Sequence, residues 1–116
     1  MKTNDLILNK KALWGDDIRN PPPSLNCDIA RNYSEAVQLL NTNCYEEIYL
    51  DHDLGDFSGP QGRERSGYDV LMYIVEMKMD GKCVPSIYHI LTANPVGRAK
   101  FKGIIDRYLT DQSADR

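Results

Sequence analysis

Short runs with strand character alternate along this chain with segments that have a helical repeat of apolar residues. The strand-like runs are Lys11–Gly15, Cys27–Arg31, Glu47–Leu50 and Ser86–Leu91. Alternation of this kind is typical of a parallel sheet wrapped by helices, because parallel neighbours need a crossover connection between them. The sequence therefore predicts an α/β fold: a three-layer, flavodoxin-like arrangement with about four parallel strands.

Three segments carry the helical repeat. The first helix is predicted over Ser34–Leu40, where Asn32 and Glu35 form a capping pair. The second begins at the N-cap Ser66, and the third follows the N-cap Asn94. Their apolar stripes are, in chain order, Tyr33, Ala36, Val37 and Leu40; Val70, Leu71, Ile74 and Val75; and Phe101, Ile104, Ile105, Tyr108 and Leu109.

The connection between the first two strand-like runs is not helical. It reads Arg-Asn-Pro-Pro-Pro-Ser-Leu-Asn over residues 19–26, and each proline lacks a backbone donor and restricts the residue before it. The first crossover helix is therefore replaced by a proline-rich loop, and one face of the sheet loses a cover. We expect the last helix, the Leu6–Leu8 segment or a second subunit in a homodimer to cover that face, since an exposed apolar face promotes aggregation.

Charge and composition exclude several classes of protein. The net charge of −3 gives no general attraction to duplex DNA or to an anionic membrane. No apolar run approaches the roughly 18 residues of a membrane span, and residues 1–11 lack the apolar stretch of a signal peptide. We therefore expect one cytoplasmic domain over residues 1–116, with residues 1–11 as an N-terminal extension and residues 110–116 as a disordered tail.

The three cysteines, Cys27, Cys44 and Cys83, are an odd number and have no Cys-x-x-Cys spacing. This pattern indicates neither a disulfide framework nor a zinc cluster. We expect all three to be reduced thiols in the core or half-buried.

Acidic residues follow two of the predicted strands at the point where each strand ends. Asp16 and Asp17 follow the first strand, and Asp51, His52 and Asp53 follow the third. If these strands are neighbours, the side chains face each other at the carboxyl edge of the sheet, where open parallel sheets bind ligands. Clustered carboxylates repel one another unless protons or a cation neutralise them. Asp16, Asp17 and Asp51 are therefore the candidate ligands of Mg²⁺ (or Mn²⁺), which bridges to phosphate oxygens.

Other polar residues near the strand ends are candidates for proton transfer and phosphate binding. Asp51, His52 and Asp53 form the candidate catalytic group. The alternative interpretation is that they have no catalytic role, because such residues are also common in turns and solvated loops. His89 is a secondary candidate, because its place inside a strand is more typical of a sheet surface. The candidate phosphate ligands are Arg19, Thr92, Asn94 and Arg98, with Lys100 as a further cation, and each cation also fits a solvated surface position.

Four segments together resemble the receiver domains of response regulators, and more closely the cyclic-phosphate processing receiver-like domain family. They are Leu13–Arg19, Ile48–Gly55, Ser66–Leu71 and Thr92–Arg98, and the resemblance runs from about Ala12 to Tyr108. It implies a truncated receiver-like fold without the fifth strand and its phosphate-binding lysine. A standard phosphorelay switch is therefore not expected.

The resemblance also implies roles for single residues. Asp16 and Asp17 correspond to the paired metal ligands of receivers, Asp51 to the phospho-accepting aspartate and Thr92 to the switch hydroxyl, while His52 and Asp53 match the cyclic-phosphate family. Two positions depart from the family pattern, which more often has leucine at Gly15 and histidine at Leu91. If that histidine is the catalytic acid, this chain binds without turnover unless His89 or His52 substitutes for it.

Three functions are open at this point. The first is a metal-dependent phosphoesterase that acts on a cyclic or terminal phosphate of a nucleotide or RNA end. The second is a non-catalytic protein that binds and sequesters a cyclic nucleotide or a related phosphorylated signal. The third is a degenerate receiver used as a protein interaction module.

Overall fold

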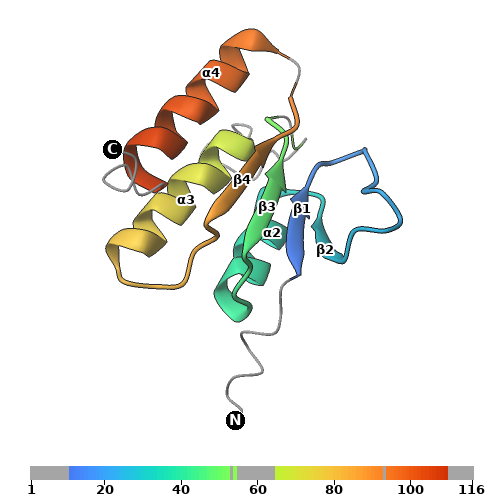
Figure 1. Ribbon diagram of the computed structural model, residues 1–116, viewed down its shortest axis with the longest axis horizontal. Helices are drawn as coiled ribbons and strands as arrows, with labels where there is room; N and C mark the ends of the chain where they lie inside the picture. Colours follow the sequence, from blue (N-terminus) through green and yellow to red (C-terminus); the bar gives the residue numbers. More distant parts are fainter. Residues whose placement is uncertain (1–10, 53, 55–64, 93, 110–116) are drawn as a thin grey trace.

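The fold is a four-stranded parallel sheet, seen in a computed structural model that describes residues 11–52, 54, 65–92 and 94–109. The strands lie in the order β2-β1-β3-β4 (Figure 1). Their bounds are β1 (Ala12–Gly15), β2 (Cys27–Ala30), β3 (Glu47–Leu50) and β4 (Ile87–Ile90), and every neighbouring pair is parallel. The prediction of a truncated flavodoxin-like sheet, with the first and third strands adjacent, is confirmed.

The helices begin where local capping signals predict. α2 (Tyr33–Thr42) starts at Asn32, whose Oδ1 accepts a hydrogen bond from the backbone N–H of Glu35 at 2.8 Å. α3 (Gly67–Met79) starts at Ser66, which forms a capping box with Asp69. α4 (Pro95–Ile104) starts at Asn94 and continues directly into the π-helical turn η2 (Ile105–Leu109). These caps satisfy backbone donors that a helix start leaves without partners.

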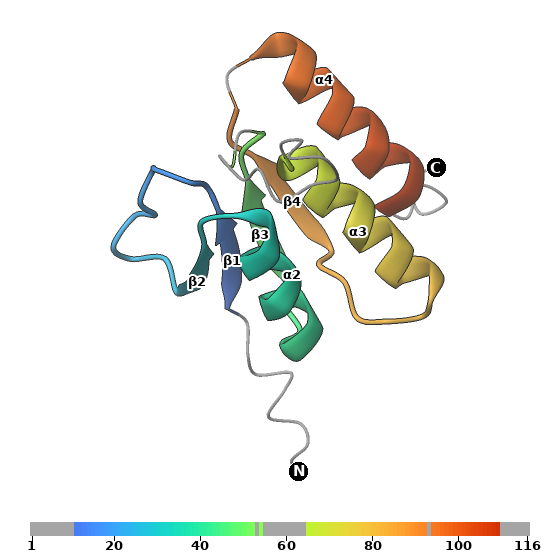
Figure 2. The ribbon, with the colours of Figure 1, turned by 180° about the vertical axis from the view of Figure 1, so that it is seen from behind.

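One face of the sheet carries the hydrophobic core. Figure 2 shows α2 and α3 in front of the strands on this face. The apolar stripe of α4 and η2 joins the same core. Its members include Leu13, Ile48 and Leu50 from the sheet, Leu71 and Ile74 from α3, and Phe101, Ile105 and Leu109 from the last helix. The expectation that the last helix covers the second face is therefore wrong, because the apolar stripe of that helix packs into the core beside α3 on the first face.

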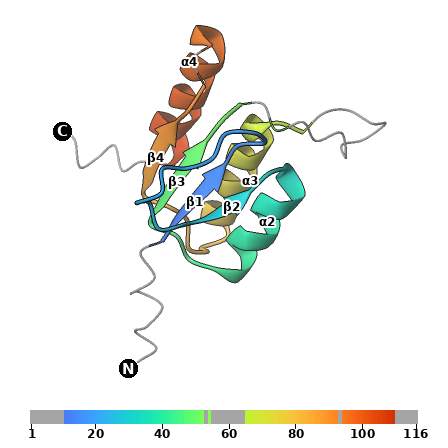
Figure 3. The same cartoon turned by 90° about the vertical axis from the view of Figure 1, so that its right-hand side faces the viewer.

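The second face of the sheet carries a row of rings instead. In the edge-on view of Figure 3 the described helices lie on the other side of the sheet or along the β4 edge. Tyr49 and His89 stack with ring centroids 4.1 Å apart, and Trp14 lies 5.4 Å from Tyr49. Trp14 is only 4% exposed, and its indole N–H donates to Arg19 O at 2.9 Å. The loop that replaces the first crossover helix thus holds Trp14 in place, whereas the Leu6–Leu8 segment lies outside the described residues.

Two of the cysteines do not follow the sequence-based prediction. Cys44 and Cys83 form a disulfide, with Cα atoms 5.9 Å apart and a sequence separation of 39, while Cys27 is a half-buried free thiol. The bridged residues precede β3 and β4, so the bond joins two loops at the amino-terminal edge of the sheet. Spacing along the chain does not reveal such a pair, because it depends on α2 and α3 being neighbours. None of the described helices is long and apolar enough to cross a membrane.

Candidate metal and phosphate site

Three carboxylates meet at the carboxyl edge of the sheet. One oxygen each from Asp16, Asp17 and Asp51 lies within 4.8 Å of the others. Asp16 directly follows β1 and Asp51 follows β3, and the N–H of Asp51 donates to Gly15 O at 2.9 Å. With Ile18 and Arg19 these residues line a hollow of about 410 Å³. The structure therefore brings together the three residues that the sequence offers as metal ligands.

The carboxylate of Asp16 has one satisfied and one unsatisfied oxygen. Its Oδ1 accepts hydrogen bonds from the backbone N–H groups of Ile18 at 2.9 Å and Arg19 at 2.8 Å. Its Oδ2 is buried and has no hydrogen-bond partner among residues 11–52, 54, 65–92 and 94–109, and Arg19 Nε lies 3.7 Å away. A buried carboxylate oxygen without a partner is unfavourable. A hard divalent cation held by all three carboxylates would satisfy it, so the residues fit Mg²⁺ or Mn²⁺.

Arg31 supports this loop, and the sequence analysis missed it. Its Nη1 donates to Asp16 O at 3.1 Å and Arg19 O at 2.8 Å, and its Nη2 donates to Asn20 Oδ1 at 2.6 Å. Together with Trp14, it fixes the backbone that presents Asp16 and Arg19. The available signal was its position immediately after β2, the strand beside β1, which places it at the same edge of the sheet.

The start of α3 packs closely against the backbone of Asp51. The N–H of Gly67 donates to His52 O at 2.7 Å, and a Cβ atom at Gly67 would collide with Asp51 O. Asp51 Oδ1 in turn accepts from the backbone N–H of His52 at 2.8 Å. Only glycine allows this close approach of α3 to the backbone of Asp51.

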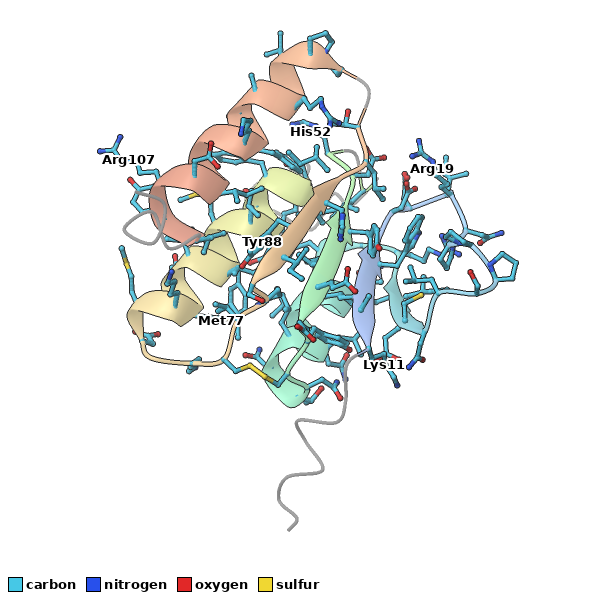
Figure 4. The ribbon with its side chains drawn as sticks, viewed as in Figure 1. Lys11, Arg19, His52, Met77, Tyr88 and Arg107 are labelled. Atoms are coloured by element: carbon cyan, nitrogen blue, oxygen red, sulfur yellow. A yellow bond between two sulfur atoms is a disulfide. The ribbon has the colours of Figure 1, made fainter. Side chains whose placement is uncertain are left out.

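His52 lines a second hollow, next to the carboxylate cluster. This hollow has a volume of about 250 Å³ and is lined by His52, Thr92, Asn94, Val96, Gly97 and Lys100. The imidazole of His52 lies 5.7 Å from the ring of Phe101. Figure 4 shows His52 beside α4 and Arg19 on the opposite side of the end of β3. Asp51 and His52 are consecutive, so each hollow has one lining residue directly after β3.

The other candidates are divided between these hollows and the β4 edge. Thr92 is 7% exposed, and Asn94 uses its Oδ1 to cap α4. Arg98 Nη1 donates to Ile90 O at 3.1 Å and Thr92 O at 3.2 Å, which holds it along β4. His89 Nε2 lies 2.9 Å from Glu47 Oε1 on the second sheet face. Arg98 and His89 are therefore not among the residues lining either hollow, and Asp53 lies outside the described residues.

A parallel sheet in this strand order, with acidic residues after β1 and β3, defines the class of receiver-like α/β domains. The chain belongs to the cyclic-phosphate processing receiver family: the family model described as "Cyclic-phosphate processing Receiver domain" matches residues 11–107. This confirms the family that the four sequence segments indicate. No curated protein and no solved structure gives a significant match.

Proposed function

We propose that this chain is a divalent-metal-dependent phosphoesterase, a hydrolase that acts on a cyclic or terminal phosphate of a nucleotide or RNA end. The observation that carries the proposal is the buried Oδ2 of Asp16, which has no hydrogen-bond partner among the described residues and lies within a cluster of three carboxylates. The association of the family with cyclic-phosphate processing supports the substrate class.

The residues of the cluster suggest a division of roles. Mg²⁺ or Mn²⁺ held by Asp16, Asp17 and Asp51 would offset charge on the phosphate oxygens and acidify a bound water. Arg19 lines the same hollow and would donate to a non-bridging phosphate oxygen. Hydrolysis of a cyclic diester adds one water and breaks one P–O bond, and His52 would protonate the departing oxygen. Asp53 stays a candidate because it matches the family motif.

The direct test is incubation with cyclic nucleotides and with RNA that ends in a cyclic phosphate, in Mg²⁺ or in EDTA. We expect a phosphomonoester product in Mg²⁺ only, detected by ³¹P NMR. Asp16→Asn and Asp51→Asn should abolish it, whereas Asp80→Asn, at the far end of α3, should not. Recovery of every ligand intact in Mg²⁺ would count against the phosphoesterase.

A second function, binding without turnover, is favoured by Leu91. The N–H of Leu91 donates to Leu50 O at 3.0 Å, which places this apolar residue beside the start of the Asp51 turn. Members of the family more often have a histidine there, so a proton donor is replaced by a side chain that has none. Calorimetry that finds tight binding of a cyclic nucleotide without product would favour this function, and steady product release would exclude it.

A further inference from the structure

The cations near the strand ends differ in what they contact. Arg98 donates to two backbone carbonyls of the β4 edge, and Lys102 pairs with Asp106 at 3.1 Å. Arg19 lies beside the carboxylate of Asp16. Lys100 forms no ion pair with any carboxylate of the described residues; its Nζ lies 4.2 Å from the centroid of the Tyr68 ring. Neither Arg98 nor Lys100 pairs with a described carboxylate, but Arg98 already donates to two carbonyls, whereas the described contact of the Lys100 ammonium is an aromatic ring.

The surroundings of Lys100 direct it toward the second hollow. Val96, Gly97 and Lys100 share one face of α4, since helix positions three and four apart are neighbours, and all three line this hollow. Tyr68 belongs to the first turn of α3, so its contact with Lys100 places the ammonium beside the start of that helix. His52, directly after Asp51, lines the same hollow.

Thr92 adds a hydrogen-bond donor to the same hollow. Its Oγ1 accepts from the N–H of Asn94 at 3.2 Å, and among the described residues no acceptor is present for its hydroxyl hydrogen. A hydroxyl that is already an acceptor still has one proton to donate. Thr92 is buried at 7% exposure, so a ligand oxygen is the natural acceptor for this proton. A hydroxyl donor and an uncompensated ammonium in one hollow fit an anion with several oxygens.

We propose that the hollow lined by His52, Thr92 and Lys100 is an anion subsite that binds phosphate oxygens. The subsite deepens the proposed function and rests on it in one respect: a substrate phosphate would span from this hollow to the carboxylate cluster. The divalent metal ion would then lie on one side of the phosphate and Lys100 on the other.

The test uses inorganic phosphate as the probe and the full chain, with and without Mg²⁺. ³¹P NMR titration should show saturable binding to the wild-type protein. Lys100→Gln should weaken this binding by about tenfold or more, since one charge-assisted contact is lost, and Lys100→Arg should restore most of it. The matched control is Lys102→Gln on the same helix, which should leave binding unchanged because Lys102 is already paired with Asp106.

Two results would overturn the subsite. One is no saturable phosphate binding by the wild-type protein in either condition, and the other is equal binding by Lys100→Gln. The rise in melting temperature caused by Mg²⁺ should persist in Lys100→Gln, because the carboxylate cluster is intact. Phosphate binding that depends on Lys100, in a protein that hydrolyses no cyclic phosphate, would contradict the phosphoesterase and leave the subsite supported.

Discussion

Asp16 has two carboxylate oxygens in very different surroundings. The two backbone N–H groups that bind Oδ1 fix the orientation of the side chain, and this orientation leaves Oδ2 buried without a hydrogen-bond partner in the part of the chain that the structure describes. The loop thus holds a buried carboxylate oxygen that no described donor hydrogen-bonds, with Arg19 Nε at 3.7 Å as its nearby cation. Asp16 Oδ2 should therefore lower the stability of the metal-free protein and at the same time raise its affinity for a metal ion.

Asp16→Asn should stabilise the metal-free protein and remove its response to Mg²⁺. The asparagine Oδ1 can still accept from Ile18 and Arg19, while the buried carboxylate oxygen without a hydrogen-bond partner is replaced by a neutral amide group, so we expect a gain of about 1–2 kcal/mol in EDTA. Urea unfolding in EDTA and in MgCl₂ measures both effects. The half-buried Asp17 gives the control: Asp17→Asn should weaken the Mg²⁺ response without the gain. A less stable Asp16→Asn protein in EDTA would contradict this account.

Arg31→Met should weaken Mg²⁺ binding although Arg31 is not a proposed ligand. The substitution removes three hydrogen bonds that hold the backbone around Asp16 and Arg19. We expect a loss of about 1–2 kcal/mol in stability and a lower Mg²⁺ affinity by calorimetry. Arg31→Lys should recover part of the affinity. Mg²⁺ affinity equal to that of the wild type in Arg31→Met would show that the loop does not need this support.

Tyr88 predicts how stability changes at alkaline pH. Its hydroxyl is buried and forms no hydrogen bond within the described part of the chain, and burial raises the pKa of Tyr88 well above its ordinary value. The folded state thus favours the neutral phenol, and this contribution is complete below about pH 10 and lost as pH rises through the raised pKa. Tyr88→Phe should raise stability by about 1 kcal/mol at neutral pH and reduce the alkaline loss. Melting temperatures across this range test it, and an unchanged alkaline slope would refute it.

At the scale of elements, the starts of α2, α3 and α4 could be predicted because their signals are local. Asn32, Ser66 and Asn94 each bind backbone N–H groups within three residues. The difference between Arg98 and Lys100 could not be predicted. Two residues apart on a helix point about 200° apart, so one cation faces the β4 edge and the other the strand ends. Whether Arg98 or Lys100 faces the strand ends depends on the rotation of α4 about its axis relative to α3, and sequence spacing alone does not fix that rotation.

The carboxylate cluster and its support show the same limit. Asp16, Asp17 and Asp51 could be predicted to meet, because adjacent parallel strands end at one edge. The contacts of Arg31 could not, since they depend on the path of the proline-rich loop. The side to which His52 turns was equally open, because residues that follow a strand have no fixed alternation.

The start of α3 allows a test with a matched pair of glycines. Gly67→Ala should destabilise the fold by several kcal/mol or displace Asp51, because its Cβ would collide with Asp51 O. Gly103→Ala, in α4, meets no atom within 4 Å and should stabilise by about 0.5–1 kcal/mol. Chemical denaturation measures both, and Mg²⁺ titration reports on Asp51. Equal effects of the two substitutions would show that the close approach at Gly67 is unimportant.

For the molecule as a whole, the two edges of the sheet carry different features. The carboxyl edge holds the clustered charges, and the amino-terminal edge holds the Cys44–Cys83 disulfide. A reducing compartment would keep such a pair as thiols, whereas an oxidising one would keep it bonded. Because the site lies at the opposite edge, the state of this bond should change global stability without changing the carboxylate cluster.

Reduction of Cys44–Cys83 should therefore lower stability while preserving the response to Mg²⁺. A bridge with a separation of 39 residues restricts the unfolded chain, and the chain-entropy estimate of its contribution is about 4 kcal/mol. Dithiothreitol, or Cys44→Ser with Cys83→Ser, should reduce the free energy of unfolding by about 2–4 kcal/mol. Cys27→Ser is the control, and thiol titration should find one reactive group in the oxidised protein under denaturing conditions and three after reduction. The carboxylate cluster lies at the opposite edge, so we expect it to keep its geometry when the disulfide is reduced. Loss of the Mg²⁺ response on reduction would instead mean that the two edges are coupled through α2 and α3.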